Sequence, residues 1–193
     1  RFMLYKIYNL NSKFNKYFKD YDFHNLYKEL LNFCTVDLSA FYFDIRKDNL
    51  YCDPKDSKKR KSTILLLNII LNSLLKWFAP ILSFTTEEIF NLLFKDQKSI
   101  HLEKFHKYPD KFKNEKLSEK WSELIKIRNI CNISIEEKRA TKEIGSSLEA
   151  DLKINLNQKL QKVTSNIDFS ELCITSKAEV SYNEDIETTA ITS

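Results

Sequence analysis

Only one glycine, Gly145, occurs among the 193 residues, and the chain has three prolines. Phosphate-binding loops of the P-loop and dinucleotide-binding kinds need several glycines, because their backbone turns tightly and approaches the ligand closely. Both kinds of nucleotide site are therefore excluded from this sequence. All-β folds need a turn residue about every 8 to 12 positions, so we expect long helices instead.

The first two helices are predicted from apolar residues that recur at helical spacing. One covers residues 2 to about 20. The other begins at Asp22, whose side chain can cap the helix. Its apolar seam has a 4-3-4-3-4 spacing, which packs helices at shallow angles. The seam consists of Tyr27, Leu31, Cys34, Leu38, Phe41 and Ile45.

Two further helices complete a predicted antiparallel bundle. The third begins near Ser57, runs to about Phe78, and is apolar almost all round from Ile64 onward, so we expect other helices to surround it. Thr85 and Glu88 have the spacing of a capping box at the start of the fourth. Short connections between these helices favour an antiparallel arrangement.

The remaining sequence predicts a surface connection over 95–115, a fifth helix to about Arg139, and a small α+β unit. The seam of the fifth helix consists of Leu117, Trp121, Leu124, Arg128, Cys131 and Ile135. Apolar and polar residues alternate over 148–156, which indicates a half-buried strand. QKLQKVT is typical of a short helix, and ELCITSKAEVSYN holds two strand candidates. The predicted fold is mainly α: a bundle over 1–110, a long helix and junction over 111–145, and an α+β unit over 146–193.

Positive charge is concentrated in one connection, DIRKDNLYCDPKDSKKRKS at 44–62, which carries seven Lys or Arg residues. Arg46 and Lys47 are predicted to end the second helix, where the helix dipole favours cations. Four more basic residues fall in the first turn of the third helix, where the dipole disfavours them: Lys58, Lys59, Arg60 and Lys61. An external phosphate would explain their position. A solvated lysine-rich loop is the alternative.

Other candidate sites are weaker. His101 and His106 lie five residues apart without a third ligand at helical spacing, so surface positions explain them better than a metal does. Asp37 and Asp44 would share a helix face, but no nucleophile lies near them in the sequence. The four cysteines form no CxxC pair, which predicts neither a zinc site nor disulfides and favours a reducing cytoplasm.

The most apolar run, residues 64–82, contains Asn68, Asn72 and Lys76 and ends near Pro80. It predicts a buried helix and no membrane partner. The chain begins with Arg1 in place of Met, so we expect a piece of a longer protein.

Three stretches carry a resemblance to a known family. These are YDFHNLYKELLNFCTVDLSAFYFDIRKDNLYCDPKDSKKRKS, LLKWFAPILSFTTEEIF and RATKEIGSSLEADLKI. In this order they resemble the C-terminal part of bacterial isoleucyl-tRNA synthetases, which are class I aminoacyl-tRNA synthetases, over nearly the whole chain. FAPILSFTTEEIF is similar to valyl and leucyl relatives too, whereas LSAFYFDIRKDNLYCD and KEIGSSLEA look particularly like the isoleucyl enzyme.

The resemblance implies a parent enzyme that joins isoleucine to its tRNA with ATP and Mg²⁺ and hydrolyses misacylated product. The HIGH and KMSKS signatures of its catalytic domain do not occur here, and the editing domain is absent. This fragment is therefore expected to have no catalytic residue and no cofactor. Many bacterial members end in a zinc-binding segment, which would lie beyond residue 193.

The implied role is recognition of the anticodon stem and loop of isoleucine tRNA by a cytoplasmic monomer, with the bundle as a class I anticodon-binding domain. The basic residues of 44–62 would hold phosphates, and Tyr51 would stack on a base or pack within its loop. Arg128 and Arg139 form a second basic group, and a buried salt bridge is the alternative for Arg128. Two other functions stay open: the equivalent domain of a valyl-tRNA synthetase, and a helical protein-interaction module.

Overall fold

The computed structural model describes residues 1–95, 98–184 and 190–192, with the backbone alone for the last three. The chain forms two compact units, Arg1–Asn114 and Glu115–Ser193. The first is helical, and the second combines helices with a small sheet. The predicted mainly α fold with an α+β unit at its C-terminal end is confirmed.

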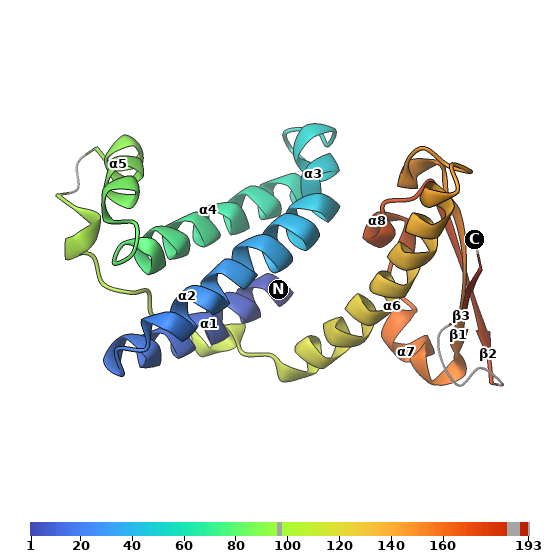
Figure 1. The fold of residues 1–193 in the computed structure, drawn as a ribbon, viewed down its shortest axis with the longest axis horizontal. Helices are drawn as coiled ribbons and strands as arrows, with labels where there is room; N and C mark the ends of the chain where they lie inside the picture. Colours follow the sequence, from blue (N-terminus) through green and yellow to red (C-terminus); the bar gives the residue numbers. More distant parts are fainter. Residues whose placement is uncertain (96–97, 185–189, 193) are drawn as a thin grey trace. The chain divides into compact units, whose positions relative to one another are not determined.

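The first unit is a bundle in which α1, α2 and α4 lie side by side, while α3 and α5 lie at opposite ends of α4 (Figure 1). Two short 3₁₀ turns, η2 and η3, follow α5. The elements are α1 (Phe2–Lys19), α2 (Phe23–Asn32), the π-helix η1 (Phe33–Phe43), α3 (Asp44–Tyr51), α4 (Lys58–Phe78), α5 (Ser83–Leu93), η2 (Ile100–Leu102) and η3 (Asp110–Phe112).

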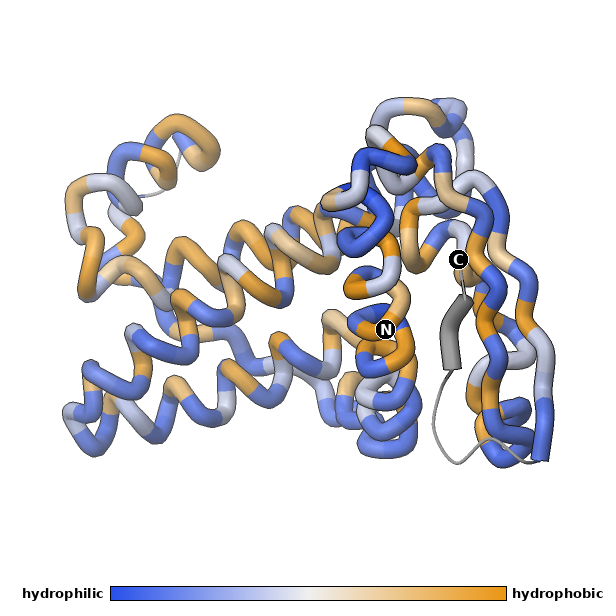
Figure 2. The backbone as a smooth tube through the Cα atoms, turned by 45° about the vertical axis from the view of Figure 1, so that its right-hand side comes forward, coloured by the Kyte–Doolittle hydropathy of each residue, from blue (hydrophilic) through white to orange (hydrophobic). Residues whose placement is uncertain are grey.

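Trp77 of α4 lies at the centre of this unit with 1% of its surface exposed. The ring of Phe14 meets it edge-on, with centroids 5.0 Å apart, and Phe33 lies 6.1 Å away. Such aromatic pairs contribute about 0.5–1.5 kcal/mol each beyond the burial of their area. Hydrophobic and hydrophilic residues alternate along α1, α2 and α4, as Figure 2 shows, and the core joins the hydrophobic faces.

The helix starts predicted at Asp22 and near Ser57 are confirmed. The Asp22 carboxylate accepts from the backbone N–H of Asn25 at 3.2 Å, and the Ser57 hydroxyl accepts from that of Arg60 at 3.4 Å. The capping box at Thr85 is wrong, because α5 already begins at Ser83 and has no side-chain cap. Thr85 therefore lies inside the first turn of the helix.

The predicted seam of the second helix is wrong in its first half. Tyr27 and Leu31 are about half exposed, and the buried residues of α2 are Leu26 and Leu30. The cause is the π-helical segment Phe33–Phe43, which has more residues per turn than an α-helix. The longer turn moves the buried face, so the predicted residues from Leu38 onward are buried again.

The expectations for the third helix and for the connection after α5 also need correction. Ile64 and Leu65 are exposed, so helices enclose α4 only from about Ile70 onward. The segment after α5 does not merely cross the surface, since the Tyr108 hydroxyl hydrogen-bonds to that of Ser73. This segment therefore belongs to the bundle.

The second unit places helices on one face of a three-stranded sheet with strand order β2-β1-β3 (Figure 1). β1 and β2 are parallel, with Asp151 opposite Lys177, and β1 and β3 are antiparallel, with Lys153 opposite Thr192. The elements are α6 (Glu115–Ala140), η4 (Ser147–Glu149), β1 (Asp151–Asn157), η5 (Gln158–Leu160), α7 (Gln161–Thr164), α8 (Phe169–Cys173), β2 (Lys177–Asn183) and β3 (Ala190–Thr192).

The alternation predicted for the strand is confirmed from Leu152 to Leu156, where every second side chain is fully buried. The prediction that Leu148 begins this strand is wrong, because Leu148 lies in the 3₁₀ turn η4 and is exposed. Of the two later strand candidates, KAEVSYN forms β2, whereas ELC belongs to α8. The Asp168 carboxylate caps this short helix.

Among the described residues, no helix is both long and apolar enough to cross a membrane. Within the same part of the chain, no group of three or more His, Cys, Asp or Glu residues is placed to hold a metal ion.

Candidate nucleic-acid interface

The connection between α3 and α4 is held by hydrogen bonds around Asp53. The Ser57 hydroxyl donates to the Asp53 carboxylate at 3.0 Å, and Nη1 of Arg60 donates to the Asp53 carbonyl at 2.7 Å. Ser57 also caps α4. One side chain of the predicted basic cluster, Arg60, therefore fixes the shape of the loop on which the other cations lie.

A second contact ties the base of this connection together. Tyr42 of η1 is buried, and its side chain hydrogen-bonds to that of Thr63 in α4. Burial is the main cause that raises the pKa of Tyr42, so the phenol stays protonated. The start of α4 and the helix that leads into α3 are thus fixed relative to each other.

Two cations of the cluster form exposed ion pairs. Nζ of Lys47 lies 3.2 Å from Asp44, and Nζ of Lys61 lies 3.2 Å from Asp56. Exposed pairs of this kind contribute only about 0.2–1 kcal/mol. A phosphate could therefore displace either carboxylate at small cost.

Lys55 and Lys58 have no ion-pair or hydrogen-bond partner for their side chains in the described part of the chain. Both are exposed, as is Lys59. Lys58 begins α4, a helix of 21 residues with no acidic residue in its first turn. Free backbone N–H groups and a positive helix end attract anions at this position.

The remaining predicted residues of the loop lie on α3. Arg46 and Lys47 are not in the last helical turn, because α3 extends to Tyr51, so the helix dipole accounts for them less well than the sequence predicted. Nη1 of Arg46 donates to Asn49 at 3.0 Å. The Tyr51 ring is 86% exposed, which speaks against packing within the loop and leaves the ring available for stacking.

Arg128 of the second predicted basic group is buried, with 8% of its surface exposed. Its Nε donates to the Leu172 carbonyl at 2.9 Å, which joins α6 to α8. Cys131 and Cys173 hydrogen-bond beside it, a contact that raises the pKa of Cys131 and lowers that of Cys173. This environment favours the buried alternative for Arg128, and the Leu172 carbonyl is one of its partners.

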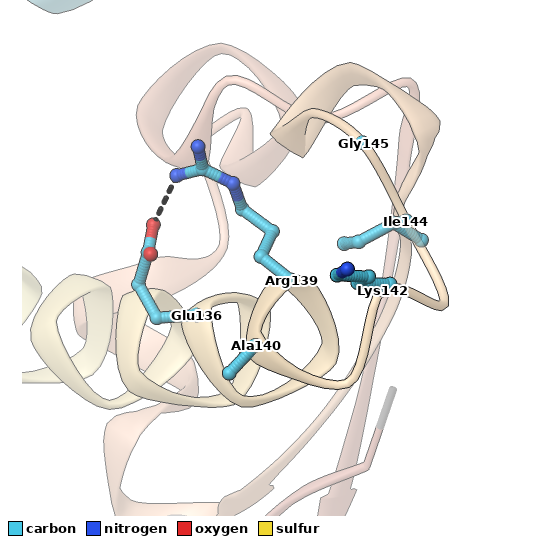
Figure 3. Close-up of a pocket in the computed structure, with 6 residues that line it drawn as sticks. All are labelled: Glu136, Arg139, Ala140, Lys142, Ile144 and Gly145. Atoms are coloured by element: carbon cyan, nitrogen blue, oxygen red, sulfur yellow. Dashed lines mark hydrogen bonds and ion pairs between the residues drawn. The ribbon is translucent and has the colours of Figure 1, made fainter.

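Arg139 lies in the last turn of α6 beside an open pocket of about 470 Å³ (Figure 3). Its Nη1 pairs with Glu136 at 2.6 Å. The pocket is lined by Glu136, Arg139, Ala140, Lys142, Ile144 and Gly145. In Figure 3 the side chains of Lys142 and Ile144 extend from the segment after the helix toward the side where Arg139 lies.

The backbone at this helix end forms a Schellman motif. The N–H of Glu143 donates to the Lys138 carbonyl at 3.1 Å, and that of Lys142 donates to the Arg139 carbonyl at 3.0 Å. Lys142 has a φ of 60°, the left-handed conformation in which such motifs usually place glycine. A side chain there costs about 1–2 kcal/mol.

Residues 1–155 match the family described as the anticodon-binding domain of tRNA ligase. The chain belongs to this family. The match covers the whole first unit, with its basic connection between α3 and α4. It also covers α6, the pocket at its end and most of β1. Both groups of cations therefore lie within the anticodon-binding domain as the family defines it.

Similar proteins carry the name isoleucine–tRNA ligase. One from Pelagibacter ubique is 71% identical over 180 residues, which are 93% of this chain and 20% of the relative. One from Bartonella henselae is 40% identical over 91% of this chain and 18% of the relative, and one from Agrobacterium fabrum is 38% identical over 93% and 19%. The chain thus spans about a fifth of the length of the curated relatives that it matches.

Sequence reasoning missed two cations of this anticodon-binding domain, Lys55 and Lys142. Lys55 belongs to the basic stretch, but it lies outside both helices, so the helix dipole gives no reason to single it out as an anion contact. Lys142 lies two residues after the end of α6 and three residues before the single glycine. A lysine at the position where a helix-ending glycine is expected is the signal that could have identified it.

Proposed function

We propose that this chain recognises the anticodon stem and loop of isoleucine tRNA as the anticodon-binding part of an isoleucine–tRNA ligase. Membership of the anticodon-binding family and the names of the relatives support the tRNA and its amino acid. The α3–α4 connection, residues 52–57 with the first turn of α4, is the proposed contact surface. Lys55, Lys58, Lys59 and Lys61 would face phosphates there, beside Lys47 of α3.

The observation that carries the proposal is the uncompensated charge of Lys55 and Lys58 beside the start of a long helix. Side chains and helix N-termini that contact phosphates fix the register of a protein on RNA. Tyr51 extends from the end of α3 into solvent, where an unstacked base could lie on its ring. A loop held by its own hydrogen bonds, with exposed ammonium groups on Lys55 and Lys58, suits a polyanion.

In this proposal the attachment of isoleucine, with ATP and Mg²⁺, and the removal of misacylated product belong to other parts of the enzyme. This chain supplies recognition and no reacting group. Action as a monomer, location in the cytoplasm and zinc in a segment beyond residue 193 stay predictions.

The test measures binding of the 193-residue chain to three fluorescent RNAs over a range of salt concentrations. They are the anticodon stem-loops of isoleucine tRNA and valine tRNA, and a hairpin of unrelated sequence. We expect preference for the isoleucine stem-loop, with log K falling linearly with log salt by about 0.7–0.9 for each phosphate contacted. Equal affinity for the three RNAs would contradict anticodon recognition, and affinity independent of salt would contradict the phosphate contacts.

A further inference from the structure

The pocket at the end of α6 contains two cations that the fold of the second unit leaves largely unused. The Lys142 ammonium has no ion-pair or hydrogen-bond partner among the described residues. The Arg139 guanidinium uses Nη1 for Glu136, and its other N–H groups have no partner in the same part of the chain. The lining of the pocket thus holds two cations and one acid (Figure 3).

The neighbouring cation on the same helix end differs in this respect. Lys138 is paired with Glu143 at 2.7 Å, and Thr141 also donates to that carboxylate, which keeps the pKa of Glu143 below its ordinary value. Glu143 is therefore committed to Lys138 and does not neutralise Lys142. The helix dipole favours a cation here but does not require an unpaired one.

The backbone strengthens the argument. Lys142 occupies the left-handed position of the Schellman motif, where glycine or asparagine would be better tolerated. Residues held in such conformations are often retained for function. A lysine without a partner at a position unfavourable for lysine points to a partner outside the chain.

We infer that this pocket binds a phosphate of the RNA backbone through the Lys142 ammonium and the unused edge of the Arg139 guanidinium. Arg presents paired donors that match phosphate oxygens, and Lys adds a point charge. The backbone N–H of Gly145 does not contribute, because it already donates to Glu149 at 2.8 Å. The inference rests on the proposed RNA-binding function and adds a second contact site to it.

The main test is the variant Lys142→Asn, which removes the charge and suits the left-handed conformation. One lost phosphate contact should weaken binding of the isoleucine anticodon stem-loop with its full stem by about fivefold at 0.1 M salt and lower the salt slope by about 0.7–0.9. The melting temperature should stay equal to that of the wild type or rise, which separates loss of contact from loss of fold. Lys142→Arg, which keeps the charge, should bind as the wild type does.

Lys126→Gln is the matched control, since it removes the same charge from an exposed position of the same helix outside the pocket lining and leaves Glu143 paired with Lys138. It should leave the salt slope unchanged; a loss equal to that of Lys142→Asn would show a general charge effect and overturn the inference. Wild-type binding by Lys142→Asn would also overturn it. The double variant Lys55→Gln/Lys58→Gln, measured in the same assay, tests the proposed function separately. If this variant loses RNA affinity and Lys142→Asn does not, the pocket at the end of α6 is excluded as a contact site while the proposed function stands.

Inorganic phosphate serves as a competing probe at constant ionic strength. An RNA phosphate held by two side chains predicts that a few millimolar inorganic phosphate leaves RNA binding unchanged. Release of the RNA by inorganic phosphate from the wild type, but not from Lys142→Asn, would also support the inference, because the ion can displace the RNA there only where the RNA is bound. Binding of inorganic phosphate to the wild type and not to Lys142→Asn, with equal RNA binding by both proteins, would assign the pocket to a small phosphate ligand and overturn the RNA contact.

Discussion

The indole N–H of Trp77 donates a hydrogen bond to Oδ1 of Asn11 at 3.2 Å inside the helical bundle. The Asn11 amide nitrogen in turn donates to the His106 carbonyl at 2.7 Å. One buried amide therefore connects α1 with α4 and with the segment after α5. A buried asparagine that satisfies a tryptophan and a loop carbonyl fixes the position of all three segments.

Replacing Asn11 with Leu should destabilise the bundle strongly. The substitution leaves the Trp77 N–H and the His106 carbonyl without partners, and each unsatisfied buried group costs about 1–3 kcal/mol. We expect a loss of about 2–4 kcal/mol in the free energy of unfolding by urea, followed by circular dichroism. Asn72→Leu is the control, because among the described residues the Asn72 side chain bonds only to its own helix. A loss below about 0.5 kcal/mol in Asn11→Leu would refute this role.

Stability should fall in mildly acidic solution because of His106. Nε2 of this histidine is buried and has no hydrogen-bond partner in the described residues. Burial, followed by the charge of Lys76, lowers its pKa from the ordinary value of 6.5. The folded state thus binds the proton less tightly than the unfolded chain does, so stability is full above about pH 6.5 and decreases as the pH falls below it.

The measurement is the free energy of unfolding between pH 7.5 and about 5, a window above the lowered pKa values of Asp22 and Glu87. His106→Gln should flatten the decrease. His101→Gln, at an exposed position, should preserve it. The assignment fails if the His106 variant keeps the pH dependence of the wild type.

Ser57 should contribute to both stability and RNA binding, because it caps α4 and holds Asp53. Ser57→Ala should cost about 0.5–2 kcal/mol, the usual loss for an N-cap. It should also weaken RNA binding, since the loop that carries Lys55 loses a tether. Ser57→Asn keeps a capping side chain and should retain most of the stability. Equal melting temperatures for the wild type and Ser57→Ala would exclude the capping role.

Much of the fold could be predicted because local signals and packing agree. Asp22 and Ser57 are good caps followed by apolar periodicity, and both helices begin there. Leu152, Ile154 and Leu156 alternate with polar residues and face a helix layer. In these segments the sequence period equals the structural period.

The wrong predictions have physical causes that a fixed period cannot reveal. The π-helical segment has more residues per turn than the 3.6 that the sequence analysis assumed. A seam drawn with a constant period through this segment therefore includes Tyr27 and Leu31, which are exposed. At α5 the helix begins at Ser83 without a side-chain cap, so Thr85 lies inside the first turn and the spacing of Thr85 and Glu88 does not mark the helix start.

The sequence predicted where the candidate site lies along the chain, but not which contacts each of its side chains makes. Sequence placed four cations in the first turn of α4, and the structure confirms that position. Arg60 nevertheless holds the loop, and Arg128 is buried against Leu172. Which cation bonds to its own chain depends on loop geometry, and composition carries no information on that.

The central claim is tested most directly by Lys55→Gln/Lys58→Gln in the salt-dependent RNA-binding assay. Two lost phosphate contacts should weaken binding of the isoleucine anticodon stem-loop by roughly thirtyfold at 0.1 M salt and lower the salt slope by about 1.5. The control, Lys16→Gln/Lys19→Gln, removes the same charge from the end of α1, far from α3 along the bundle (Figure 1), and should change the slope little. Equal slopes for the wild type and Lys55→Gln/Lys58→Gln would contradict the claim that the α3–α4 connection contacts RNA.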